Sequence, residues 1–136
     1  MVSAAKRSAP ALALLVHPNM AVLSALQHSF EARGFHSVVS RDMPTAMLAL
    51  SQHDFAVAVI YHRVAEDGDG FSVGAMARRI FPNAHIAVIC GEKDVVSLQA
   101  AINNRLDQVF EEKAGSEQVV DAILGKLGKA ETASVQ

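Results

Sequence analysis

The sequence predicts an α/β fold, a doubly wound, five-stranded parallel sheet with five helices covering its two faces. Short apolar runs alternate with amphipathic stretches five times along the 136 residues. The connections between them are short, and strand–helix alternation of this kind is typical of parallel sheets. The apolar runs are nearly continuous, as expected for strands that are covered on both faces.

The first half of the chain supplies three strands and two helices. Strands are expected over residues 11–16, 36–41 and 55–61, and helices over 20–33 and 44–53. Three residues typical of helix ends lie between these segments and support the predicted boundaries. Asn19 is a typical N-cap, Gly34 a typical left-handed C-terminal cap, and Pro44 a typical first-turn residue.

The second half begins with the acidic, glycine-rich residues 66–70, which predict a turn; a calcium loop is disfavoured because the downstream glutamate is missing. Helices are expected over residues 71–81 and 94–104, and strands over 86–89 and 108–111. Ser116 is expected to cap the last helix. Its apolar stripe consists of Val119, Val120, Ile123 and Leu127.

Composition fits one globular domain, which we place at residues 9–129 between a flexible leader (1–8) and a flexible tail or linker stub (130–136). Hydrophobic residues make up 51% of the chain, charged residues 19%, and the net charge is -2. That balance gives no basic surface for nucleic acid or an anionic membrane. The first apolar run is too short to span a bilayer, and the single cysteine excludes an internal disulfide. We therefore expect a cytoplasmic protein.

Functional groups in such folds collect beyond the carboxyl ends of the strands, where the strand order reverses. The residues expected there are His17, His62, Cys90 and Glu112. Two imidazoles and a thiol suit Zn²⁺ or another borderline metal, and imidazoles also titrate near neutral pH. The simpler alternative is that His17, His62 and Cys90 are neutral polar residues that fill a vestigial pocket.

Five segments together resemble the receiver domain of response regulators (the CheY-like family). They are LLVHPN at 14–19, AVAVIYH at 56–62, DG at 69–70, AVICG at 87–91 and LDQVFEE at 106–112. They follow in the family's order over nearly the whole chain. The resemblance implies a flavodoxin-like sheet with strand order 2-1-3-4-5.

The residues that carry receiver chemistry are all replaced. His17 and Pro18 stand at the acidic pair that binds Mg²⁺ in the family, and His62 stands at the phosphoacceptor aspartate. Cys90 replaces the Thr or Ser, and Glu112 replaces the lysine unless a one-residue slip aligns Lys113. Acyl phosphate formation needs a carboxylate nucleophile and a hard cation. The resemblance therefore implies a degenerate pseudo-receiver, with no enzyme activity and no cofactor. In addition, Val109 stands at the switch aromatic of the fifth strand.

The resemblance also implies a protein partner in bacterial two-component, phosphorelay or transcriptional signalling. The face that receivers use for dimerisation combines the fourth helix, fifth strand and fifth helix, and a homodimer through it is one candidate. In this sequence the dimerisation face would carry Asp94, Gln99, Asn103, Arg105 and Asp107. No contact with nucleic acid or a membrane is expected.

Four alternatives remain open at this point. The first is a metal, small-ligand or pH sensor that uses a pocket of His17, His62 and Cys90. The second is phosphorylation of His62, for which only Arg63 is an adjacent cation. The third is an enzyme of the doubly wound class, although no acid–base pair or cofactor motif is present. The fourth is that the chain is the N-terminal part of a larger regulator.

Overall fold

A computed structural model describes residues 11–63, 69–91 and 94–135. All strands pair in parallel in the order β2-β1-β3-β4-β5, which confirms the predicted sheet. The strands are β1 (Leu12–Val16), β2 (His36–Ser40), β3 (Val57–Tyr61), β4 (His85–Cys90) and β5 (Gln108–Glu111). The strand order reverses between β1 and β3, so the carboxyl ends of these two strands flank the predicted site.

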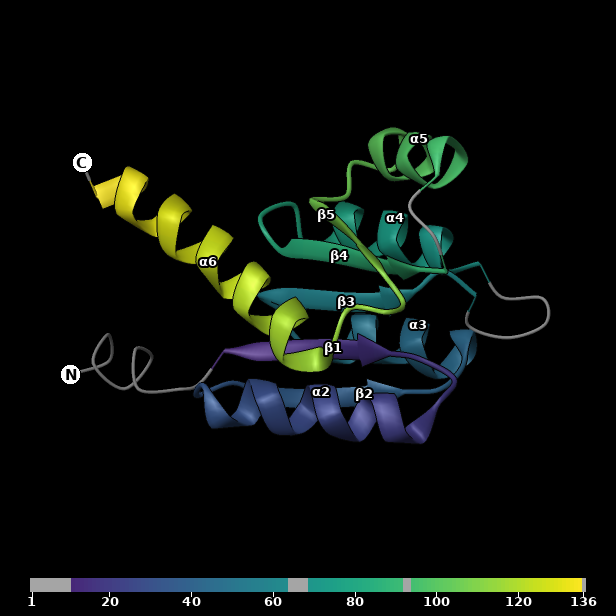
Figure 1. Cartoon of the computed structure of the whole chain (residues 1–136), viewed down its shortest axis with the longest axis horizontal. Helices are drawn as coiled ribbons and strands as arrows, with labels where there is room; N and C mark the ends of the chain where they lie inside the picture. The colour runs from purple at the N-terminus through teal and green to yellow at the C-terminus, as the bar shows by residue number, and fades with distance from the viewer. Residues whose placement is uncertain (1–10, 64–68, 92–93, 136) are drawn as a thin grey trace.

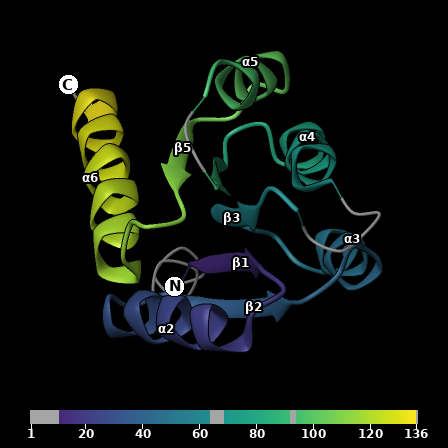
Figure 2. The same cartoon turned by 45° about the vertical axis from the view of Figure 1, so that its right-hand side comes forward.

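Five helices connect and follow the strands: α2 (Met20–Ala32), α3 (Met43–Gln52), α4 (Gly70–Ile80), α5 (Val95–Asn103) and α6 (Ser116–Val135). Figure 2 shows α2 and α6 on one side of the sheet and α3 and α4 on the other. The two ends of α2 are capped as the sequence predicts. Asn19 accepts the N–H groups of Ala21 and Val22, and Gly34 has the left-handed φ of 89°.

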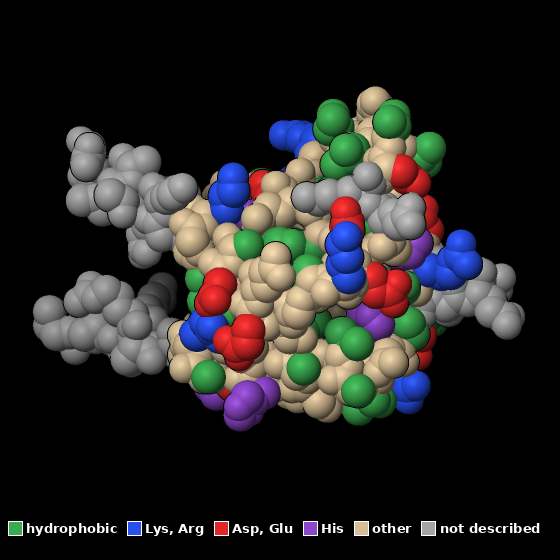
Figure 3. Space-filling model, viewed as in Figure 1, with side chains coloured by type: hydrophobic (Ala, Val, Ile, Leu, Met, Phe, Trp, Pro, Cys, Tyr) green, Lys and Arg blue, Asp and Glu red, His purple; other side chains and the backbone are tan. Residues whose placement is uncertain are grey.

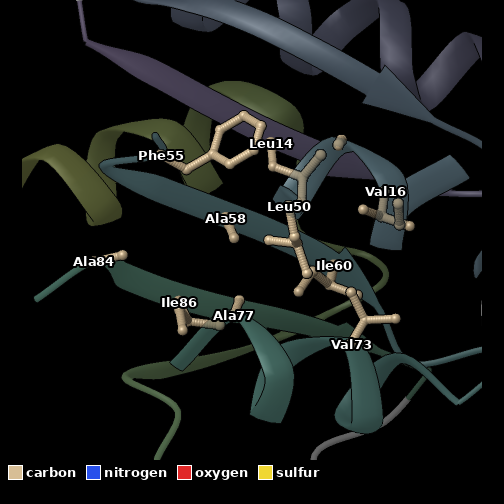
Figure 4. Close-up of a cluster of buried hydrophobic side chains, with 12 residues drawn as sticks. Leu14, Val16, Leu50, Phe55, Ala58, Ile60, Val73, Ala77, Ala84 and Ile86 are labelled. Carbon is tan, nitrogen blue, oxygen red and sulfur yellow. The ribbon is translucent and has the colours of Figure 1, made fainter. Parts of the chain in front are cut away.

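Alternation along the strands divides the core into two halves. Leu14, Ala58, Ile60 and Ile86 point toward α3 and α4 (Figure 4). The residues next to them in each strand point toward α2 and α6, where they meet Leu23, Leu26 and Phe30 of α2 and the buried stripe of α6. This division fixes the face on which each residue at the carboxyl ends must emerge.

Gly70 lies where the loop after β3 returns to the sheet. Its N–H donates to the His62 carbonyl at 2.9 Å, and a Cβ on it would lie 2.0 Å from the Tyr61 carbonyl oxygen. Only glycine allows this approach. Asp69 then starts α4 by accepting the Phe71 N–H at 2.9 Å.

Two details differ from the sequence predictions. Cys90 is the last residue of β4 and does not follow it, because it pairs with Glu111 of β5. Ser116 is the first residue of α6 and not the residue before it. The helix runs to Val135 (Figure 1); alanine, lysine and glutamate favour helix at its end. The leader at 1–8 and loop residues 66–68 lie outside the described residues. Within the part of the chain that the structure describes, no helix is long and apolar enough to cross a membrane.

Candidate functional site

His17 follows β1 and is 5% exposed. Its backbone N–H donates to the Ser40 carbonyl at 3.1 Å, which extends the ladder by one residue and keeps His17 on the face of Ala13 and Leu15. Its ring Nδ1 accepts the Asn19 N–H at 3.0 Å. An accepting nitrogen carries no proton, so this bond selects the neutral ring with its proton on Nε2. Burial lowers the pKa of His17, and the nearby Glu112 carboxylate partly opposes that effect.

Tyr61 and Glu112 complete a group around His17 on the α2/α6 side of the sheet. The rings of His17 and Tyr61 lie 4.3 Å apart between centroids, tilted by 45°. Burial raises the pKa of Tyr61, and a hydrogen bond to the Glu112 carboxylate raises it further. Glu112 is placed by its own N–H, which donates to the Cys90 carbonyl at 2.6 Å. We call His17, Tyr61 and Glu112 the histidine cluster.

Cys90 belongs to the opposite face. Alternation places it on the same side as Ile86, toward α3 and α4. The His62 ring instead packs against Tyr61, with ring centroids 4.8 Å apart. The Cys90 thiol is fully buried, and burial raises its pKa although a hydrogen bond with Ser97 lowers it. Asp94 caps α5 by accepting the Ser97 N–H at 2.8 Å. That bond lowers the pKa of Asp94, and the nearby His62 also favours the charged carboxylate.

The structure therefore does not bring the three residues together in one pocket. His17 lies on one face of the sheet and Cys90 on the other. The rings of His17 and His62 both pack against Tyr61. Among residues 11–63, 69–91 and 94–135, no three His, Cys, Asp or Glu side chains are grouped so that they could hold a metal ion. The three-ligand metal site considered from the sequence is thus not formed. The strand register explains the separation of His17 from Cys90. Val16 is level with Ile60 and Ile60 with Val88, so His17 is level with Ile89, and Cys90 lies one residue further along its strand.

Pro18 and Lys113 take other roles. The Pro18 carbonyl accepts two hydrogen bonds from the Arg41 guanidinium, at 3.1 and 3.0 Å. The Lys113 side chain is 85% exposed and pairs with Glu111 at 3.2 Å. Glu112 is thus the residue of this turn whose carboxylate faces Tyr61 and His17. Tyr61 was missed in the sequence analysis. Its signal was the only tyrosine of the chain, at the end of an apolar strand.

The residues of the predicted interaction face are exposed. Gln99 and Asn103 bond to each other at 3.0 Å. Arg105 adopts a left-handed φ of 61°. Asp107 also holds the fold together, since it pairs with Arg78 and accepts the Ile86 N–H at 2.7 Å. The Arg78 side chain is only 11% exposed.

Apolar side chains are the main feature of this face, and the sequence analysis missed them as well. Val95, Val96 and Ile102 are 80%, 77% and 69% exposed. Figure 3 shows hydrophobic side chains gathered over α5. The signal was present in the sequence, because residues 95–102 contain only two polar side chains and so no polar face.

No protein-family model and no curated protein matches the sequence. Solved structures do match the fold. A CheY-like response regulator receiver domain protein from Methanospirillum hungatei JF-1 has a TM-score of 0.82 at 15% identity, over 91% of this chain and 98% of that one.

A response regulator from Burkholderia pseudomallei, with a phosphorylated aspartic acid, a calcium ion and citrate, has a TM-score of 0.77 at 17% identity, over 91% of this chain and 72% of that one. An adenylate cyclase from Rhodopirellula baltica has a TM-score of 0.77 at 20% identity, over 93% of each chain. The chain has the fold of receiver domains.

Proposed function

We propose that the chain is a signalling module of the receiver fold that acts through contacts with another protein and without aspartate phosphorylation. The support for phosphorylation independence comes from the carboxyl ends of the strands. His17 and Pro18 offer no oxygen side chains for Mg²⁺, and His62 offers no carboxylate nucleophile. Glu112 places a negative charge where a phosphoryl group would need a cation. The setting we propose is bacterial two-component or transcriptional signalling.

The exposed apolar face of α5 is the single observation that carries the proposed contact. It borders a groove of about 230 Å³ between α5 and β5. The apolar part of the lining is Leu98, Ala101, Ile102, Leu106 and Val109. An apolar helix face beside a groove of the same character is typical of a protein interface.

The occupant we propose is a second copy of this chain. Asp94 lies at the start of α5 and Arg105 follows its end, and both are exposed. In a two-fold arrangement with antiparallel α5 helices, the acidic end of each helix meets the basic end of its partner. The apolar side chains between them then cover each other. The face is thus complementary to itself in both charge and polarity.

Sedimentation equilibrium tests this proposal with two matched variants. The Ile102→Glu variant puts a charge into the apolar face, and the Leu48→Glu variant puts one on α3, where Leu48 is 55% exposed. We expect a dimer for the wild type and Leu48→Glu and a monomer for Ile102→Glu. Circular dichroism confirms that all three are folded. A monomeric wild type, or equal dissociation of both variants, would exclude the dimer.

A further inference from the structure

The histidine cluster connects the starts of the two helices on one face of the sheet. His17 lies in the β1–α2 connection, three residues before α2 begins, and Glu112 lies in the turn before α6. The helices themselves are tied together by Arg33 at the end of α2, which pairs with Glu117 at 2.7 Å and Asp121 at 2.6 Å. A change in the cluster therefore acts on both helices of this layer. Figure 3 shows acidic and histidine side chains next to each other near the carboxyl ends of the strands.

We propose that the histidine cluster is a proton-operated switch, in which protonation of His17 replaces its bond from Asn19 by an ion pair with Glu112. This inference concerns a different face from the proposed dimer contact and does not depend on it. The bond that must break is the one from the Asn19 N–H to His17 Nδ1, at 3.0 Å.

The physical reason is the change of the ring from acceptor to donor. In the neutral form Nδ1 accepts the Asn19 N–H at 3.0 Å, and the Glu112 carboxylate lies near enough to act on His17. A proton taken from solvent onto Nδ1 would point at the Asn19 N–H, so Asn19 must move. The imidazolium then attracts the Glu112 carboxylate. Because Asn19 is the N-cap of α2, both the start of α2 and the turn before α6 rearrange.

The charged and titratable groups around His17 come from four neighbouring segments. Tyr61 of β3 contacts the ring, and Glu112 before α6 is the charge that acts on it. Arg41, after β2, holds the Pro18 carbonyl between His17 and α2. His62 lies beyond Tyr61, with ring centroids 4.8 Å apart. Arg63 and Cys90 act on Tyr61. Glu112 is the only one of these groups that favours the imidazolium directly.

Nuclear magnetic resonance tests the switch by following the His17 ring and the backbone amides of Asn19 and Glu112 during acidification. In the wild type we expect all three to titrate with one midpoint. In the Glu112→Gln variant the midpoint moves to lower pH, because the stabilising charge is lost.

Two further variants separate the switch from a structural role. The His17→Asn variant keeps a side-chain oxygen to accept the Asn19 N–H but does not titrate in this range, so the Asn19 transition disappears while the fold is retained. The His53→Gln variant, at an exposed histidine at the end of α3, leaves every midpoint unchanged. An Asn19 transition that persists in His17→Asn overturns the proposal. So does a His17 midpoint that is the same in Glu112→Gln and in the wild type.

Discussion

Arg78 of α4 reaches across the edge of the sheet to pair with Asp107, just before β5. The same guanidinium donates to the carbonyls of Pro82 and Ala84, both at 2.8 Å, and of Arg105 at 2.9 Å. The Asp107 carboxylate in turn accepts the Ile86 N–H. This pair joins α4 to the start of β4 and to the connection between α5 and β5.

Removal of this guanidinium is expected to lower the free energy of unfolding substantially. We expect the Arg78→Ala variant to lose about 2–3 kcal/mol, because three carbonyls and a carboxylate lose their donors. Lysine recovers only part of this loss, since it lacks the planar fork of donors. Urea unfolding measures the effect. The exposed neighbour Arg79 is the control, and equal losses in Arg78→Ala and Arg79→Ala would contradict the account.

The close approach at Gly70 predicts a strong effect of a single methyl group. In the Gly70→Ala variant the new Cβ meets backbone atoms of Tyr61 and His62, which cannot yield as a side chain would. We expect a loss of about 3 kcal/mol or an unfolded chain. The Gly91→Ala variant is the matched control, because a Cβ there has no atom within 4 Å. Thermal unfolding of the two variants compares them directly. Equal midpoints would show that the loop does not return to β3 in this way.

Burial of His17 predicts a loss of stability in mild acid. Its folded pKa lies below the usual value of 6.5, so the native state binds its proton less readily than the unfolded chain. The contribution is complete above about pH 6.5 and is lost as the pH falls from there through the folded pKa. We expect the free energy of unfolding to fall less steeply in His17→Asn than in the wild type over this range. Parallel curves for the two proteins would mean that His17 is solvated.

Cys90 is expected to react slowly with thiol reagents in the native protein. The thiol is fully buried, and burial raises its pKa, so both access and the thiolate fraction are small. Ellman's reagent should modify it slowly in buffer and quickly in denaturant. Rapid modification of the folded protein would contradict the buried position at the end of β4.

The fold could be predicted from the sequence because most strands are short apolar runs and four of the five described helices begin after a capping Asn or Asp. Asn19, Gly34 and Pro44 mark helix ends without any tertiary information. The strand order came from the resemblance to receivers. The site was harder to predict, since the end of a strand does not reveal which face a residue occupies until its register is known.

The separation of His17 from Cys90 is therefore a tertiary result, decided by the parity of β1 and β4. The ion pair of Asp107 with Arg78 is also a tertiary result, because the two residues are distant in sequence. The apolar face of α5, by contrast, could have been predicted from the sequence, because residues 95–102 leave the helix without a polar side. Only the polar residues of this face were considered in the prediction.

Phosphorylation independence is the central claim, and beryllofluoride with Mg²⁺, which mimics the phosphorylated state of receivers, tests it most directly. Amide spectra of the protein are recorded before and after addition. We expect the peaks of His62, Cys90 and Glu112 to stay in place. We also expect no response from the His62→Asp variant, because His17, Pro18 and Glu112 still deny the cation and the lysine contact. Shifts at these amides in the wild type, as in an activated receiver, would contradict the account.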